Sequence, residues 1–281
     1  MKKIILLLTL TILLSGCSVS LNNMDNISIY TTVYPLEYLS NMLYGNNSTI
    51  NSIYPNEIVE LSNKLIEDYS KKDLFVYNGL SEEKNYAVDM LNYNKHLMIV
   101  DAAMGMEFTY GEEELWINPS NFLMLSQNIK NGMKEYITTT YLKNMIEKNY
   151  NNLKIEISEI DAEIKLIVEM SDKSNILIGN DSLLFLEKYG LNIYSLDNDT
   201  ITNKKISDAE TAITQNSIKY IYLFENDILS EEVENILNKK KIKKIYIHTI
   251  TLLSEEQKNN GENYITMMQK NIDLLKKELY E

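Results

Sequence analysis

Three consecutive glutamates, 112–114, precede Trp116, the only tryptophan of the chain, and Pro119, one of its three prolines. Carboxylates in this position can do two things. They can bind a hard cation such as manganese, magnesium or calcium, because those ions prefer oxygen ligands. They can also lie beside the positive end of a helix that Asn118 and Pro119 are suited to begin. The residues alone leave both interpretations open.

Histidine and cysteine, which commonly bind metals or act in catalysis, are scarce. The chain has two histidines, His96 and His248, and one cysteine, Cys17. We expect His96 at the surface, leading into a strand, and His248, at the end of a strand, on the wall of a cleft. No nucleophile and base stand in the order that a hydrolase needs, and no glycine-rich phosphate loop is present. The sequence therefore gives no support for an enzyme.

The chain is strongly acidic, with 40 acidic residues against 27 basic ones and a formal net charge of -13. All 27 basic residues are lysine, so the bidentate guanidinium fork that recognises phosphate and carboxylate groups is missing. An acidic protein is a poor partner for nucleic acid but remains suited to cationic ligands. We therefore expect no nucleic acid among its partners.

The N-terminus resembles a bacterial export signal. Two lysines precede an apolar run over residues 4–14, which is shorter than the roughly 20 residues that span a bilayer. The Leu-Ser-Gly-Cys tetrad that ends at Cys17 resembles the lipobox of lipoproteins, in which the signal is removed and the cysteine is lipidated. We therefore predict a signal peptide at 1–16 and a lipid-anchored tether at 17–26. The protein would then lie at the outer face of the bacterial plasma membrane.

The elements that must position these residues form two series in which strands alternate with helices, a pattern typical of parallel βαβ units. In the first series we expect strands at 27–32, 49–53, 74–77 and 97–100, and helices near 36–44, 57–69 and 82–92. In the second series we expect strands at 176–178, 192–194, 218–223 and 245–248, and helices near 182–189, 207–215, 230–239 and 262–280. These series predict an N-terminal lobe at 27–120 and a C-terminal lobe at 171–281.

A long helical pattern lies between the two series, over residues 121–170, with a break near 136–140. Its clearest part is one apolar stripe with spacings of four, three, four and three residues, formed by Leu153, Ile157, Ile160, Ile164 and Ile167. With nine glycines and three prolines in 281 residues, the chain shows no flexible linker. The fold class we predict is α/β, with two lobes of parallel βαβ units joined by a long rigid backbone helix.

Six segments of the chain, taken in order, resemble the signature segments of one protein family. They are TTVYPLEYLSNMLYGN (31–46), KKDLFVYNGLSEE (71–83), ELWINP (114–119), FLEKYGL (185–191), IKYIYLFENDILSEEVENI (218–236) and NYITMMQKNIDLLKKEL (263–279). The family is that of the zinc and manganese receptor lipoproteins of bacterial ABC importers, the ZnuA/TroA type, which includes streptococcal proteins once called adhesins. The resemblance implies one metal ion held between two lobes by four side chains, mostly histidines.

The metal ligands are where this chain departs from the family. Glu114 stands at one histidine position, and counting back from the Tyr-Asn-Gly at 77–79 places Glu57 at another. Gly179 falls on the third position and is followed by Asn180 and Asp181, while the fourth position has no clear counterpart. The resemblance therefore implies an oxygen-rich site. Its metal ligands would be Glu57, Glu114 and Asp181, with Trp116, Asn180 and His248 on the cleft wall.

Three functions are compatible with these features. The first is a monomeric surface lipoprotein that captures a divalent metal ion, manganese or zinc, and delivers it to an ABC permease and its ATPase. The second is a degenerate receptor of the same fold, with no metal, a chelated metal or another solute in its cleft, or with a role in adhesion. The third is a lipoprotein hydrolase, for which no nucleophile is found. The missing histidines motivate the second.

Overall fold

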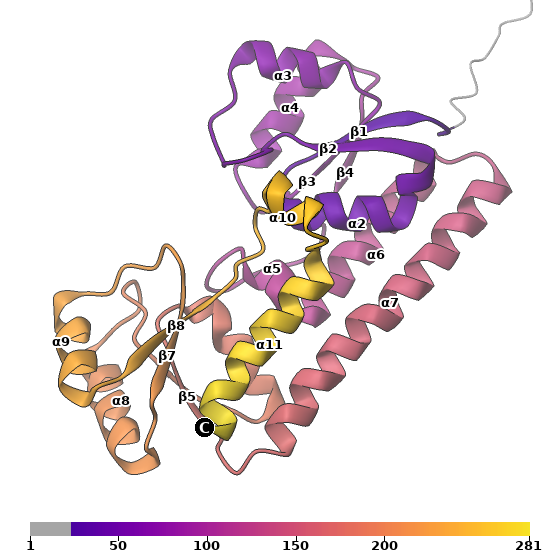
Figure 1. The fold of residues 1–281 in the computed structure, drawn as a ribbon. Helices are drawn as coiled ribbons and strands as arrows, with labels where there is room; N and C mark the ends of the chain where they lie inside the picture. The colour runs from indigo at the N-terminus through magenta and orange to yellow at the C-terminus, as the bar shows by residue number, and fades with distance from the viewer. Residues whose placement is uncertain (1–23) are drawn as a thin grey trace, which may run out of the picture.

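The computed structural model describes residues 24–281, and its first sheet forms the N-terminal lobe (Figure 1). The four strands are parallel and have the order β2-β1-β3-β4. The strands are β1 Ile27–Thr31, β2 Ser48–Ser52, β3 Leu74–Tyr77 and β4 Met98–Asp101. Between them lie α2 Tyr34–Tyr44, the 3-10 turn η1 Gly45–Asn47, α3 Asn63–Ser70 and α4 Glu83–Tyr93. This lobe is the first predicted series.

The second sheet forms the C-terminal lobe and repeats the same topology. Its four parallel strands have the order β6-β5-β7-β8. They are β5 Asn175–Ile178, β6 Asn192–Ser195, β7 Tyr220–Phe224 and β8 Lys243–Ile247. The helical elements between them are η2 Asp181–Tyr189, α8 Asn203–Asn216 and α9 Glu231–Lys240, of which η2 is a 3-10 run. The α/β fold class with two parallel lobes is confirmed.

Five further helices complete the fold of residues 24–281. They are α5 Glu114–Ile117, α6 Pro119–Tyr136, α7 Thr140–Glu169, α10 Glu255–Asn259 and α11 Tyr264–Tyr280. Two of them, α7 and α11, run from one lobe to the other (Figure 1). The helical pattern breaks where it was predicted to break, because Thr139 is extended and its side chain caps α7 by accepting the N–H of Leu142. Helix α7 is about 45 Å long at 1.5 Å per residue, so it reaches from one lobe to the other.

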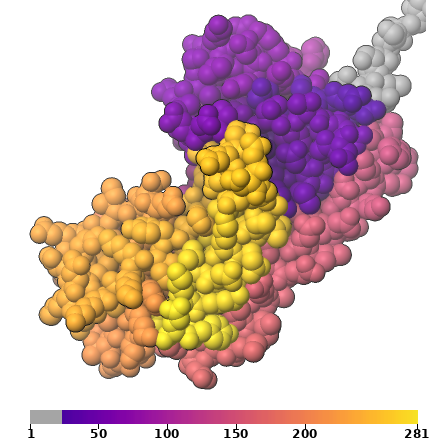
Figure 2. All heavy atoms as spheres, viewed as in Figure 1, coloured from indigo at the N-terminus to yellow at the C-terminus, as the bar shows by residue number. Residues whose placement is uncertain are grey.

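The apolar stripe on α7 is the face by which this helix packs against both lobes. Leu153, Ile157, Ile160, Ile164 and Ile167 are all buried. The helix packs against α2 and α6 in the N-terminal lobe and against η2 and α11 farther along. Figure 2 shows α11, in yellow, lying across both lobes on the visible face. Two long helices therefore connect the lobes where the sequence predicted one.

Two hydrophobic clusters make up the core. The larger cluster is continuous from the N-terminal sheet, along α7 and α11, to residues of the C-terminal sheet such as Ile178, Tyr222 and Ile247. The smaller cluster joins that sheet to α8 and α9, through residues such as Leu177, Ile221 and Val233. Since successive residues of a strand point to opposite faces, Leu177 and Ile178 belong to different clusters. The C-terminal sheet is thus covered on both faces.

The structure corrects four details of the predicted elements. The helix expected near 207–215 begins at Asn203, because Thr202 caps it. The helix expected from residue 57 begins at Asn63, because Ser62 caps it and residues 53–62 form a loop. The helix expected near 182–189 is a 3-10 run. Helix α10, closed by a capping box at Ser254 and Gln257, was not foreseen. Observed strand bounds lie within two residues of the predicted ones.

Predictions about the N-terminus fall largely outside the described part of the chain. The signal peptide at 1–16 and the lipidated Cys17 lie there, as does most of the tether at 17–26. Within residues 24–281, none of the helices combines the length and the apolar character needed to cross a membrane.

Candidate functional site

The lobes meet where the loop after β4 touches the start of η2. All strands within each sheet are parallel, so their carboxyl ends lie at one edge, where clefts form in α/β proteins. A Cβ atom on Gly111 of this loop would lie 2.3 Å from Ser182 Oγ and 2.9 Å from Glu113 Oε2, so only glycine fits without displacing a neighbour. We call this contact region the junction.

A row of carboxylates crosses the junction from one lobe to the other. In the N-terminal lobe, Glu83 Oε2 accepts the backbone N–H of Asn78 at 3.3 Å, and Glu112 Oε2 accepts the side-chain Nδ2 of Asn78 at 3.2 Å. Glu113 comes next in the chain, and its charge interacts with Asp227 of the C-terminal lobe. Glu83, Glu112, Glu113 and Asp227 are called the acidic row below.

Each member of the acidic row has a raised pKa. Burial, assisted by the charge of Glu112, raises the pKa of Glu83 to about 7. Burial also raises the pKa of Glu112, helped by Glu113, and that of Glu113, helped by Asp227. Burial and the charge of Asp197 raise the pKa of Asp227. The charges that raise these pKa values are all carboxylates, so a cation at the junction would relieve their repulsion.

The hydroxyl of Ser182 is a further polar group at the junction. Ser182 is buried beside Gly111, and its Oγ has no hydrogen-bond partner among the described residues. A buried hydroxyl without a partner costs about 1–3 kcal/mol, so such groups usually meet a ligand or a water molecule. The junction therefore offers an oxygen donor beside the carboxylates.

The three predicted metal ligands are not assembled into one site. Glu57 is exposed in the loop between β2 and α3, and the Glu114 carboxylate accepts the N–H of Thr109 at 3.4 Å. Over residues 24–281, there is no group of three His, Cys, Asp or Glu side chains that could hold a metal ion.

Asp181 has a different environment from the one that a metal ligand needs. It is 2% exposed, accepts hydrogen bonds from the hydroxyls of Ser195 and Thr200, and pairs with Lys205 at 3.5 Å. The carboxylate is therefore already compensated within its own lobe. The structure does not place it in the acidic row, because its donors lie on β6 and the segment after it.

Asn180 and Trp116 were both predicted to lie on the cleft wall. Asn180 caps η2 by accepting the N–H of Ser182 at 2.9 Å, and it donates to Asp227 at 2.9 Å, so it contacts the acidic row. Trp116 is only 1% exposed, and its indole N–H donates to the Thr249 carbonyl at 2.8 Å. This buried hydrogen bond therefore connects Trp116 to the segment that follows β8 in the C-terminal lobe.

The two interpretations of the Glu-Glu-Glu segment are resolved in part. Asn118 does cap α6, accepting the N–H of Ser120 at 3.2 Å, and Pro119 is the first residue of that helix. Glu113 is the N-cap residue and Glu114 the first residue of the short helix α5, so these carboxylates stand at the start of α5 and not of α6. Glu112 and Glu113 belong to the acidic row.

His248 lines a cavity of about 170 Å³ at the carboxyl ends of β7 and β8. Glu225 and Gln257 line the same cavity. Asn271 holds the His248 backbone with two hydrogen bonds of 2.9 Å, one to its N–H and one to its carbonyl. His248 therefore does line a polar cavity, although the acidic row does not include it.

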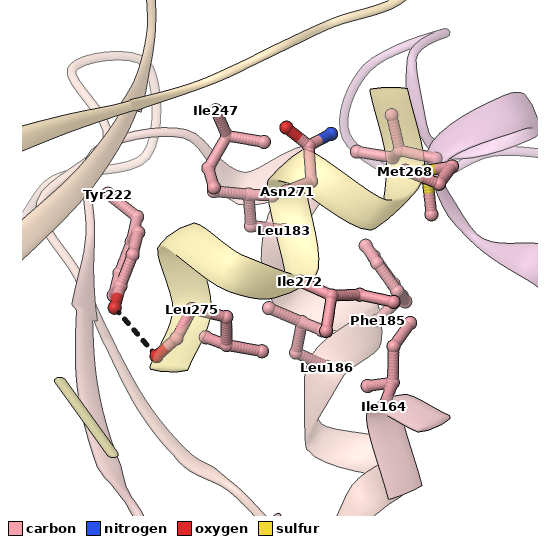
Figure 3. A pocket seen from close by; sticks show the side chains of 11 residues that line it. Ile164, Leu183, Phe185, Leu186, Tyr222, Ile247, Met268, Asn271, Ile272 and Leu275 are labelled. Atoms are coloured by element: carbon pink, nitrogen blue, oxygen red, sulfur yellow. Dashed lines mark hydrogen bonds between the residues drawn. The ribbon is translucent and has the colours of Figure 1, made fainter. Parts of the chain in front are cut away.

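A second, apolar cavity lies between η2, β7 and the helices α7 and α11 (Figure 3). It measures about 40 Å³ and is lined by side chains such as Leu183, Ile272 and Leu275. The hydroxyl of Tyr222 at its edge donates to the Leu275 carbonyl at 3.0 Å. We assign it no binding role, since an apolar cavity without free polar groups is a packing gap.

Sequence reasoning missed Glu83, Glu112, Glu113 and Asp227 as a group. Asp227 lies three residues after the carboxyl end of β7, and that position was a usable signal. Glu112 and Glu113 are the neighbours of the predicted ligand Glu114 in the sequence. Only the directions of the three side chains, which the sequence does not give, distinguish them. Gly179, at the third family position, has no room for a side chain, because a Cβ atom would lie 2.1 Å from Leu223 Cδ2.

Fold and junction together define a class, that of two-lobed binding proteins with a rigid helical connection. Residues 29–278 match the family described as zinc-uptake complex component A, periplasmic, and the chain belongs to this family. It is therefore a substrate-binding protein of metal transport. Residues 1–18 match the prokaryotic membrane lipoprotein lipid attachment site. No curated protein matches the chain.

Solved structures share the fold. The metal-dependent lipoprotein YcdH of Bacillus subtilis has a TM-score of 0.74 and 21% identity, covering 91% of this chain and all of that one. The Zn(II)-bound ZnuA-like domain of Streptococcus pneumoniae AdcA has a TM-score of 0.70 and 22% identity over 91% of this chain and 100% of that chain. The laminin-binding protein Lbp of Streptococcus pyogenes has a TM-score of 0.69 and 17% identity, with coverages of 91% and 99%.

Proposed function

We propose that this protein captures a divalent metal ion at the inter-lobe junction and delivers it to an ABC permease and its ATPase. The observation that carries the proposal is the acidic row, in which one buried and three partly buried carboxylates, drawn from both lobes, repel one another. Buried charges of one sign are retained at a cost, and a bound cation offsets that cost. Protons and a metal ion would therefore compete for these carboxylates.

The donor set favours a hard ion. Carboxylate, amide and hydroxyl oxygens suit manganese, magnesium or calcium, whereas the zinc sites of proteins draw on imidazole and thiolate. Of the two ions expected from the family resemblance, manganese fits these oxygen donors better than zinc. Glu113 and Asp227 would hold the ion between the lobes, with Glu112 beside them. Glu57 and Glu114, at family positions, remain proposed outer donors.

Metal capture requires a small rearrangement. Because the carboxylates are not gathered around one point, binding would draw the side chains of the acidic row together. The helices α7 and α11 cross both lobes and limit the movement to loops such as 102–113 and 225–230. We therefore expect no large hinge rotation, and comparison of metal-free and metal-soaked crystals tests this.

The proposed location follows from the lipid attachment match at residues 1–18. Lipidated Cys17 would hold the receptor as a monomer at the outer face of the bacterial plasma membrane, beside its permease. Replacing Cys17 by alanine should leave the body folded and move it from the membrane to the soluble fraction. Membrane retention of a folded Cys17→Ala variant would contradict lipid anchoring.

The deciding experiment measures metal binding by the Cys17→Ala protein without its leader. Thermal unfolding with manganese, calcium and zinc should show the largest stabilisation with a hard ion, about 2.7 kcal/mol at a hundredfold excess over the dissociation constant. Glu113→Gln and Asp227→Asn should each weaken the effect. Glu159→Gln, an exposed position on α7, is the matched control and should leave it unchanged.

A second candidate function is a degenerate receptor that has lost its metal and serves in adhesion or binds another solute. Two observations favour it. A side chain at Gly179 would collide with Leu223, and the carboxylates of residues 24–281 are not gathered into a group that could hold a metal ion. Metal content measured by mass spectrometry on protein purified without chelator separates the two candidates. A metal-free protein that no ion stabilises would overturn the metal receptor and favour this alternative.

A further inference from the structure

Strand β6 forms an open edge of the C-terminal sheet. It pairs with β5 on one side and is the terminal strand in the order β6-β5-β7-β8. The N–H groups of Asn192 and Leu196 donate to carbonyls of the β5 side, those of Ser174 and Ile178. Since backbone groups alternate along a parallel strand, the N–H groups of Ile193 and Ser195 point away from the sheet.

This edge forms the floor of a groove. Ile193, Tyr194 and Ser195 line it one after another, with η2 on one side and α8 on the other. The wall on α8 is a single helix face at spacings of three, three, one, three and one, formed by Lys205, Asp208, Thr211, Ala212, Gln215 and Asn216. The groove measures about 490 Å³, and Tyr110 of the junction loop also lines it.

The dimensions fit an extended segment of polypeptide. The helix face from Lys205 to Asn216 is about 16 Å long at 1.5 Å per residue, which equals about five residues of extended chain at 3.3 Å each. A peptide lying there could pair with the outward N–H and C=O groups of β6.

The charges of the walls define the side chains that such a segment should carry. Glu187 on η2 and Asp208 on α8 are exposed and line the groove, and within residues 24–281 neither takes part in a salt bridge. The only lysine in the groove, Lys205, already pairs with Asp181 and donates to Thr200 at 2.6 Å. The walls therefore attract basic side chains.

We propose that this groove binds an extended, lysine-bearing segment of a partner protein, which adds to β6 as a fifth strand. The backbone of the segment would pair with the groups at Ile193 and Ser195, and its lysines would lie against Asp208 on the α8 wall, while the residues between them face η2. Alternate residues of an added strand face opposite walls, so a lysine at every second position reaches one wall. This site is separate from the acidic row and does not depend on metal binding.

The test uses an acetylated and amidated hexapeptide of alternating lysine and valine as the probe. Titrated into the Cys17→Ala protein without its leader, it should bind with a dissociation constant of about 1 mM or tighter. Its binding should shift the NMR signals of the Ile193 and Ser195 amides. The same peptide with alternate amides N-methylated cannot pair with the strand and should not bind.

Two kinds of variant distinguish strand pairing from charge attraction. Ile193→Pro removes one outward N–H at a strand edge, where proline is tolerated, and should abolish binding. Asp208→Lys should weaken binding about fivefold, the scale of one exposed ion pair. Glu210→Lys is the matched control, since it makes the same charge change on α8 outside the groove and should leave binding unchanged.

Several outcomes would overturn the proposal. One is the absence of saturable binding at about 5 mM peptide, a concentration well above the expected dissociation constant. Another is equal binding of the N-methylated peptide, which would show attraction to an acidic protein without strand addition. Equal weakening by Asp208→Lys and Glu210→Lys would lead to the same conclusion. Circular dichroism of each variant confirms that a loss of binding is not a loss of fold.

Discussion

Two buried carboxylates, one in each lobe, show how environment decides what an acidic residue can do. Asp181 in the C-terminal lobe is surrounded by two hydroxyl donors and Lys205. Glu83 in the N-terminal lobe accepts the N–H of Asn78, but its charged neighbour is another carboxylate, Glu112. The charge of Asp181 is compensated by these partners, whereas the charge of Glu83 is offset only when a proton or a cation binds. Burial alone therefore does not identify a functional carboxylate.

The largest effect is expected from breaking the compensated carboxylate. Asp181→Ala would leave Ser195, Thr200 and Lys205 without their common acceptor, so we expect a loss of about 3–5 kcal/mol in the free energy of unfolding. Urea unfolding followed by circular dichroism measures this loss. Asp199→Ala, at an exposed position nearby, is the control and should change stability little. A loss below about 1 kcal/mol in Asp181→Ala would mean that the network does not stabilise the lobe.

The second prediction concerns Glu83 and pH. Its pKa is raised from 4.5 to about 7 in the folded protein, so the folded state holds a proton that the unfolded state has released between those values. The free energy of unfolding should therefore fall as pH rises from about 4.5 to 7, by up to about 3 kcal/mol from this group. Glu112, Glu113 and Asp227 act in the same direction.

Glu83→Gln tests that contribution directly. Glutamine cannot ionise, so the variant should lose less stability than the natural protein between pH 5 and pH 8, measured by urea unfolding without metal. Manganese should likewise reduce the loss of stability of the natural protein between pH 5 and pH 8, because a bound cation favours the ionised carboxylates. An identical pH profile in the variant would show that Glu83 does not titrate in this range.

The smallest effect is expected from Lys205. Its ammonium group lies 3.5 Å from Asp181, but the lysine side chain is partly exposed and two hydroxyls remain as donors. We therefore expect Lys205→Met to cost about 1 kcal/mol. Thermal unfolding at pH 7 measures it. A cost equal to that of Asp181→Ala would show that the ion pair, and not the hydroxyl pair, compensates the carboxylate.

Local signals made most of the fold predictable. The stripe from Leu153 to Ile167 has helical spacing, and burial of all five residues follows from that spacing. The helix start at Pro119 was predictable because Asn118 and Pro119 act through their own backbone and nearest neighbours. Helix α3 begins later than expected since Ser62, a residue well suited to capping, was not recognised as the cap.

The candidate site was harder to predict, since it depends on contacts between distant residues. Trp116 was expected on the cleft wall, but its partner is the Thr249 carbonyl, 133 residues farther along the chain. Asp181 was predicted to be a metal ligand, but its carboxylate accepts hydrogen bonds from the hydroxyls of Ser195 and Thr200, which are distant in the sequence. Glu112 and Glu113 could not be ranked against Glu114, because the direction of each side chain depends on how α5 packs.

The sequence by itself determined the two α/β series, the stiff helices between them, the acidic character and the near absence of imidazole. These properties follow from periodicity, capping and composition, which act over a few residues. Only the tertiary structure decided which carboxylates lie together, that Asp181 is compensated while the acidic row is not, and that one edge of the second sheet stays open. Charge compensation and groove shape are set by distances between segments, and those distances exist only once the chain has folded.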